Sequence, residues 1–315
     1  MRNSGARIAV PLRTRSEIAG VLLLGPPVGR EEYSQAGKEA LHRGAEQFAF
    51  MIENARLTDR VVEQEKLRRD LALAAEVQRR LLPEQPPEAA VAALSAVSLP
   101  ARTVGGDYYD FLDAGDHRIG IALADIAGKG VAAALIMSVV QASLRIISAE
   151  GDISLPQLAA KMNHFLHRST SSNSYATFFY AQIDERNRQL RYVNAGHNPP
   201  YLLRSIDVHP SGDLIPDIQE LTTGGTVLGL FPQMSYQEAT VDLRPGDVLI
   251  AFTDGVTEAL NPEEEEFGEE RLKDVLRRVV HLPVHEISSR ISDELRMWIK
   301  DAAQHDDLTF IVMRV

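Results

Sequence analysis

The 315-residue sequence contains no cysteine. Disulfide bonds, zinc–thiolate sites and thiol nucleophiles are therefore excluded, and any bound metal must use oxygen or imidazole ligands. Long apolar runs are also missing, because no stretch approaches the roughly 20 residues that span a bilayer. The first ten residues, MRNSGARIAV, lack the charged-then-apolar order of a signal peptide. We therefore expect a cytoplasmic protein.

Basic residues are fewer than acidic residues. Lys and Arg number 33 against 44 Asp and Glu, so the formal net charge is −11 at pH 7. Most of the surface would then repel nucleic acid and anionic lipid, and we expect neither nucleic acid nor a membrane as the main partner. The hydrophobic share of 44% is sufficient for a buried core. The length favours one large domain with additional segments.

The N-terminal part of the sequence predicts a hairpin followed by helix. Residues 7–24 contain two apolar runs around the polar stretch RTRSE, and such a hairpin cannot be stable alone. Residues 35–82 contain no proline and are rich in alanine and leucine, which predicts one long helix or two in succession. The prolines of PEQPPEAA then end the helix and mark a linker.

This helix contains a short apolar seam, in which spacings of four and three relate Leu67, Leu71, Ala74, Gln78 and Leu81. These are the spacings of a dimeric coiled coil, although they last for only about two heptads. The alternative is an amphipathic helix that packs on its own domain. We expect residues 57–82 to pair with a second copy, because the front end is too short to cover the seam.

Beyond Pro100, short apolar runs separated by Gly and Asp predict a larger domain of mixed α and β structure. We expect strands at 118–124, 177–183, 190–194, 201–204, 248–252 and 309–315. We expect helices at 130–148, 155–168, 269–280 and 284–302, the first of them well buried. The helices come in pairs with runs of strands between them, which favours antiparallel sheets covered by helices.

Four aspartates lie at strand ends or glycine turns, where a carboxylate can point into a cleft. They are Asp107 in VGGDYYD, Asp125 in ALADIAGKG, Asp254 in AFTDGVTEA and Asp306 in QHDDLTFIV. Mg²⁺ and Mn²⁺ prefer oxygen ligands and take few carboxylates each, so four aspartates could hold two ions. Two such ions can activate water for attack on a phosphoryl group. The alternative is that these aspartates only cap turns, and spacing alone does not name the reaction.

A family resemblance narrows this choice. It is found, in this order, in VGGDYYDF, ALADIAGKGVAAALIM, ATFFYAQID, YVNAGHNPPYLL, VLGLFP, LRPGDVLIAFTDGVTEALN, EFGEERL and HDDLTFIVMRV. These segments resemble the bacterial SpoIIE/RsbU-type phosphatases of the PPM (PP2C-like) family over about residues 96–315. The resemblance implies an α+β fold, a PP2C-like α-β-β-α sandwich with two central antiparallel sheets. It also implies a metal-dependent protein serine/threonine phosphatase that uses two Mn²⁺ or Mg²⁺ ions.

The resemblance also implies roles for individual residues. Asp125 would bridge the two ions, and the backbone carbonyl of Ile126 would complete the ligands of one. Asp107, Asp254 and Asp306 would supply the remaining carboxylates, so the four aspartates are the expected catalytic residues. Asp307 would be structural.

The sequence departs from broader PP2C enzymes in two ways. These enzymes carry a histidine, thought to be the general acid, two places after the bridging aspartate, where this sequence has Ala127. Their phosphate-gripping arginine has no clear counterpart here. The source of the leaving-group proton stays open, with a metal-bound water as one candidate. We expect structural roles for His197 and His305, while Lys129 in AGKG could approach a phosphate but lacks P-loop spacing.

Three segments are expected: a GAF-like sensor piece at 1–56, a helical coiled-coil linker at 57–95 and the phosphatase domain at 96–315. Residues 6–57 resemble the C-terminal part of a GAF domain, and AAEVQRRLLPEQPP resembles the linker that joins sensors to this class of phosphatase. The resemblance further implies a homodimer through the linker helix. It implies a phosphorylated STAS-type anti-anti-sigma protein as the substrate, in partner-switching signalling.

Two other functions are alternatives to the phosphatase hypothesis. A catalytically dead binding module could keep the fold, but the presence of all four aspartates argues against it. A nucleotide cyclase is suggested only by the three residues GGD at 105–107. Metal-dependent hydrolysis of p-nitrophenyl phosphate separates the phosphatase from both alternatives.

Overall fold

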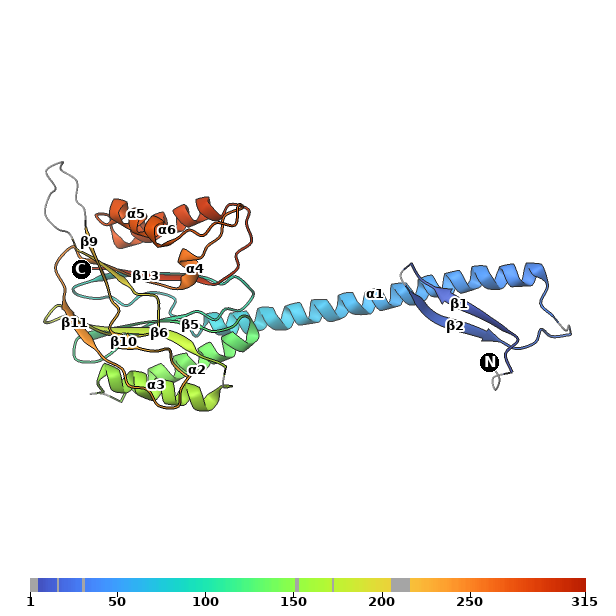
Figure 1. The fold of residues 1–315 in the computed structure, drawn as a ribbon, viewed down its shortest axis with the longest axis horizontal. Helices are drawn as coiled ribbons and strands as arrows, with labels where there is room; N and C mark the ends of the chain where they lie inside the picture. Colours follow the sequence, from blue (N-terminus) through green and yellow to red (C-terminus); the bar gives the residue numbers. More distant parts are fainter. Residues whose placement is uncertain (1–4, 16, 30–31, 151–152, 172, 205–215) are drawn as a thin grey trace. The chain divides into compact units, whose positions relative to one another are not determined.

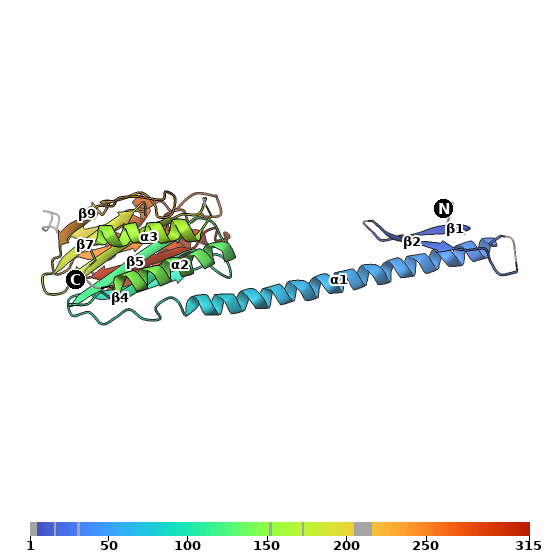
Figure 2. The same ribbon diagram turned by 90° about the horizontal axis from the view of Figure 1, so that it is seen from below.

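The computed structural model describes residues 5–15, 17–29, 32–150, 153–171, 173–204 and 216–315. The chain divides into two compact units, Met1–Ala72 and Leu73–Val315. Each unit is described by itself, and Figures 1 and 2 show the elements of both.

The first unit contains the predicted hairpin and most of the predicted helix. Strands β1 (Ile8–Arg13) and β2 (Ile18–Leu24) pair antiparallel, and helix α1 spans Gln35–Arg79. An ion pair of 2.8 Å joins Arg56 of α1 to Glu17 next to β2. Helix α1 is one continuous element of 45 residues, and it ends shortly before the prolines of PEQPPEAA. The GAF-like nature of residues 1–56 stays a prediction.

The second unit contains two sheets. In the first, the strand order is β10-β7-β6-β5-β4, and β11 also pairs with β7. Its strands are β4 (Tyr108–Asp113), β5 (Arg118–Ile126), β6 (Ala176–Asp184), β7 (Gln189–Ala195), β10 (Gly224–Gly225) and β11 (Ala239–Asp242). In the second, the order is β3-β13-β12-β8-β9. Its strands are β3 (Ala93–Leu99), β8 (Tyr201–Arg204), β9 (Asp217–Glu220), β12 (Val248–Phe252) and β13 (Leu308–Arg314).

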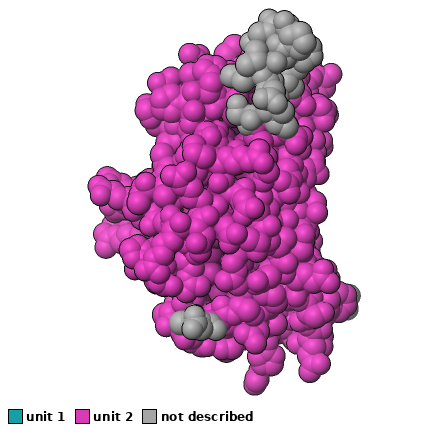
Figure 3. Space-filling view, turned by 90° about the vertical axis from the view of Figure 1, so that its left-hand side faces the viewer, with its two compact units in different colours: residues 1–72 teal, residues 73–315 magenta. Residues whose placement is uncertain are grey.

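Helices cover the outer face of each sheet (Figure 1). On the first sheet these are α2 (Val131–Ser148) and α3 (Leu155–Ser169), and on the second α5 (Glu269–Val279) and α6 (Val284–Ile299). A single-turn helix, α4 (Asp254–Thr257), follows β12. All strand pairs within the described residues are antiparallel except β10 with β7. The expected α-β-β-α sandwich is confirmed, and Figure 3 shows one face of this unit as a continuous packed surface.

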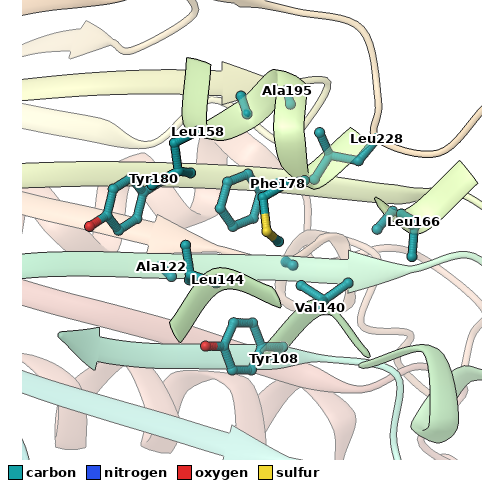
Figure 4. Close-up of a cluster of buried hydrophobic side chains, with 14 of the residues drawn as sticks. Tyr108, Ala122, Val140, Leu144, Leu158, Leu166, Phe178, Tyr180, Ala195 and Leu228 are labelled. Carbon is teal, nitrogen blue, oxygen red and sulfur yellow. The ribbon is translucent and has the colours of Figure 1, made fainter. Parts of the chain in front are cut away.

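Alternation along the central strands builds three layers of core, because successive side chains of a strand point to opposite faces. In β5, Ile121 and Leu123 join the cluster between the sheets, whereas Ala122 and Ala124 face the cluster under α2 and α3. Figure 4 shows the cluster under α2 and α3, with Tyr108 and Phe178 among its labelled side chains. Both faces of these strands are buried, which explains why they appear in the sequence as continuous apolar runs.

Helix α2 is less buried than its sequence predicts. By length and composition it is apolar enough to cross a membrane, contrary to our expectation that no such stretch exists. One face contributes Met137, Val140 and Leu144 to the core, while Leu135 and Ile146 are exposed. A core helix of a soluble protein passes the same composition test, and one face of α2 lies in the core here.

An ion pair with a buried carboxylate joins α2 to the sheet. Arg145 of α2 donates to both carboxylate oxygens of Asp110 in β4, at 2.7 and 3.0 Å. The hydroxyl of Tyr108 donates to the same carboxylate at 2.7 Å. Asp110 is fully buried, so these bonds replace the water that its charge would otherwise require.

Candidate active site

The four predicted aspartates, which we call the aspartate cluster, lie at neighbouring ends of strands from both sheets. Asp107 directly precedes β4, and Asp125 is next to last in β5, whose Ala124 pairs with Tyr108. One residue, Thr253, separates Asp254 from the end of β12, and one residue, Asp307, separates Asp306 from the start of β13. Since β12 and β13 are also antiparallel neighbours, each sheet supplies two carboxylates from adjacent ends of two paired strands.

The carboxylates of the aspartate cluster repel one another. Burial, and then the charge of Asp125, raises the pKa of Asp107 well above its ordinary value. Burial raises the pKa of Asp125 to about 7, with the charges of Asp254 and Asp306 next in importance. Burial and the charge of Asp306 raise the pKa of Asp254 as well. The charged forms of these carboxylates are therefore disfavoured without a cation, and a bound cation would favour them.

Two side chains hold the backbone and carboxylate of Asp107. The hydroxyl of Thr253, which is fully buried, donates to Asp107 Oδ2 at 2.8 Å and accepts from the Thr309 amide at 3.1 Å. The carboxylate of Asp307 accepts from the amides of Ala101, Gly106 and Asp107 at 2.8, 2.5 and 3.4 Å. This geometry agrees with the structural role that the resemblance implied for Asp307. Sequence reasoning missed Thr253, although its place between a buried strand and Asp254 was visible.

Glycines bring the backbone of the cluster together. A Cβ on Gly106 would lie 3.1 Å from the carbonyl oxygen of Ile126, and one on Gly105 would clash with the Asp307 carboxylate. The expected backbone ligand Ile126 is thus next to the loop that carries Asp107. The donor set, four carboxylates and a carbonyl, is the all-oxygen chemistry that Mg²⁺ and Mn²⁺ prefer, so these residues fit such ions. Within the described residues, however, no three acidic or imidazole side chains already converge as a ligand set.

A lysine occupies part of this charged edge. The ammonium of Lys129, in the turn between β5 and α2, lies 2.8 Å from Asp306 Oδ2 and donates to the His305 carbonyl at 2.8 Å. Its charge lowers the pKa of both Asp125 and Asp254, although burial and the neighbouring carboxylates outweigh it.

The side chain of His197 is buried and makes a polar contact, whereas that of His305 is exposed. His197 is buried, its Nδ1 is 2.8 Å from the Thr177 hydroxyl, and its amide donates to Asn194 Oδ1 at 2.7 Å. Burial lowers the pKa of His197 to about 4, so its ring is neutral at pH 7. The side chain of His305 is exposed, and only its carbonyl contacts Lys129.

The last turn of α1 contacts the loop before Asp107. The side-chain amide of Gln78 donates to the Gly105 carbonyl at 2.7 Å, and its oxygen accepts from the Gly105 amide at 3.1 Å. Both groups belong to the second unit. The end of the helix and the Asp107 loop are therefore joined two residues from the aspartate cluster.

Comparison with known proteins places this site in a family. The family model of stage II sporulation protein E (SpoIIE) matches residues 115–315, which include Asp125, Asp254 and Asp306 but not Asp107. The chain belongs to the SpoIIE family. Phosphoserine phosphatase RsbU of Bacillus subtilis is 30% identical over 252 residues, covering 80% of this chain and 71% of RsbU. Protein IcfG of Synechocystis sp. is 31% identical over 272 residues, covering 78% of this chain but only 41% of IcfG.

Solved structures agree with this assignment. The SiaA-PP2C domain of Pseudomonas aeruginosa superimposes with a TM-score of 0.68 at 25% identity, covering 80% of this chain and 98% of that domain. The predicted fold family and enzyme class, a protein serine/threonine phosphatase of the SpoIIE type, are therefore confirmed. The roles of the individual aspartates stay predictions.

Proposed function

We propose that this protein hydrolyses phosphoserine or phosphothreonine on a partner protein, with two Mn²⁺ or Mg²⁺ ions held by the aspartate cluster. The main support is that four aspartates at the ends of strands from two sheets are near enough for their charges to affect one another. Burial and mutual repulsion there raise the pKa of Asp107, Asp125 and Asp254. Such an arrangement is costly without cations, so it favours a function that binds them.

The residues of the site have distinct tasks in this proposal. Asp125 would lie between the two ions, with Asp107, Asp254, Asp306 and the carbonyl of Ile126 as the other ligands. When bound, the ions supply a nucleophile at neutral pH and positive charge beside the phosphoryl group. Thr253 fixes one oxygen of Asp107 through its 2.8 Å hydrogen bond.

The proton for the leaving group is not supplied by the conspicuous histidine. His197 is buried and neutral at pH 7, and its Nδ1 is occupied by Thr177. Ala127, where broader PP2C enzymes have a histidine, has no proton to give. A water molecule in the cleft is therefore our proposed general acid.

The proposed substrate is a phosphorylated STAS-type anti-anti-sigma protein in the cytoplasm. One supporting observation is the similarity to RsbU, which is named a phosphoserine phosphatase. The proposed active form is a homodimer through residues 57–82. Leu67 of the seam is 59% exposed in the described chain, which supports an intermolecular contact there.

The test is phosphate release from a phosphorylated STAS protein and from a phosphoserine peptide, in Mn²⁺, in Mg²⁺ and in EDTA. We expect turnover with either ion and none in EDTA, and faster turnover on the protein than on the peptide. Asp254→Asn, which keeps the size of the side chain, should abolish turnover. Hydrolysis that persists in EDTA would exclude the metal mechanism, and hydrolysis of the peptide alone would exclude the proposed substrate class.

A further inference from the structure

Lys129 is placed in contact with the aspartate cluster by an unusual turn. Gly128 and Gly130 flank it with φ angles of 106° and 76°, which non-glycine residues rarely adopt. The turn leads the side chain from the edge of the first sheet to Asp306, at the edge of the second. Among the described residues, Lys129 is the cationic side chain that forms an ion pair with a member of the aspartate cluster.

The ion pair competes with a metal ion. Asp306 Oδ2 accepts the ammonium at 2.8 Å, and a dication on that oxygen would repel the ammonium strongly at such short range. The lysine side chain is 44% exposed and flexible, so it can move. It lines a hollow of about 160 Å³ together with Glu258 and Asp306, which gives the ammonium room to leave.

An ammonium displaced from Asp306 could bind the phosphate group of a substrate. A phosphoryl substrate brings negative charge to an edge already crowded with carboxylates, in a chain of net charge −11. The sequence has no clear counterpart of the arginine that grips the phosphate in broader PP2C enzymes. Lysine is a suitable phosphate ligand as a point charge on a mobile stem.

We propose that Lys129 alternates between two partners, neutralising Asp306 in the metal-free protein and binding a phosphate oxygen of the substrate once a metal has displaced it. This inference rests on the proposed function, because it assigns a phosphate-positioning residue to the same site. Lys129 would thus hold the metal-free site together and make phosphate binding dependent on metal.

The test uses the full-length protein and three variants. Lys129→Met removes the charge, and Lys129→Arg keeps it. Lys161→Met is the matched control, because Lys161 is 45% exposed and ion-paired with Glu150 on the surface of the same unit. Thermal melting in EDTA confirms that each variant is folded. Mn²⁺ binding is followed by electron paramagnetic resonance, and binding of inorganic phosphate to the Mn²⁺-loaded protein by calorimetry.

Two opposite changes are expected from Lys129→Met. Its Mn²⁺ affinity should rise by roughly 5- to 100-fold, the usual range for the loss of a competing interaction. Its phosphate affinity should fall about tenfold or more, with a raised KM for phosphopeptide, while Lys129→Arg keeps most of it. Lys161→Met should change neither.

The outcomes separate this inference from the proposed function. Unchanged or weaker Mn²⁺ binding by Lys129→Met, or unchanged phosphate binding, would overturn the role of Lys129. If both changes occur but the wild-type protein releases no phosphate from any phosphoprotein, the proposed function fails and the role of Lys129 in anion binding stands.

Discussion

Replacing Asp125 by asparagine keeps the shape of the side chain and removes its charge, so the change isolates the electrostatic cost of the aspartate cluster. In Mn²⁺ we expect Asp125→Asn to abolish phosphatase activity, because the proposed bridging carboxylate is lost. In EDTA we expect the same variant to be more stable than the wild type, because like charges repel when no cation separates them. A residue with only a structural role would not give both results.

The size of the second effect follows from the pKa of Asp125, about 7 in the folded protein against an ordinary value of 3.8. As pH rises, the unfolded chain loses this proton first, so the metal-free fold loses stability between about pH 4 and pH 7. At about 1.4 kcal/mol per pKa unit, the ceiling is about 4 kcal/mol. Solvent screening in the cleft reduces it, and we expect about 1–3 kcal/mol in favour of the variant at about pH 8. Near pH 4 the two proteins should be equally stable.

The assay is thermal and urea unfolding at both pH values, in EDTA and in Mn²⁺. Asp110→Asn is the matched control, because that carboxylate is buried but satisfied by Arg145 and Tyr108. It should destabilise the fold by on the order of 2 kcal/mol, opposite in sign to Asp125→Asn. Mn²⁺ should stabilise the wild type and not the Asp125 variant. The reasoning is refuted if Asp125→Asn is no more stable than wild type in EDTA at high pH, or stays active in Mn²⁺.

Three further predictions concern Thr253, His197 and the dimer. Thr253→Val keeps the volume of the side chain but removes the hydroxyl that orients Asp107. Titration with Mn²⁺ should therefore show an affinity for the ion that is weaker by about 10-fold or more. An unchanged affinity for Mn²⁺ would mean that Thr253 does not support the site. His197→Ala should lower stability by about 2–4 kcal/mol yet keep most of the turnover, and a complete loss of kcat in the folded variant would contradict its structural role. In sedimentation at tens of micromolar the chain should be a dimer through residues 57–82, whereas a folded monomer would mean that the seam packs internally.

The central strands were predictable because burial on both faces leaves an unmistakable apolar run. All five residues of β12 are buried, and the predicted bounds 248–252 are those observed. Strand β4 was missed for the opposite reason. Its sequence YYDFLD contains Asp110, and a charged residue argues against a buried strand. The partner that permits its burial, Arg145, lies 35 residues away on α2, and such a contact cannot be seen in local sequence.

The same limit applies to the site. Positions of the aspartates at strand ends were predictable, because a strand that meets a glycine turn or a short helix exposes its last side chains. Their mutual approach depends on two sheets that pack face to face, an arrangement that the family resemblance implied. The pairing of Lys129 with Asp306 joins residues 177 positions apart, in loops next to different sheets, which spacing cannot reveal. The resemblance did not supply it either.

The division of the aspartate cluster between two sheets determines what can disturb it. Asp107 and Asp125 move with the first sheet, and Asp254 and Asp306 move with the second. The distance between the pairs therefore depends on groups that join the sheets at this edge. Thr253 and Asp307 of the second sheet bind Asp107 and the amides around it. Gln78 binds Gly105 in the same loop, so displacement of the last turn of α1 would act first on the loop that carries Asp107. Such a displacement would change the distance between Asp107 and the other proposed metal ligands.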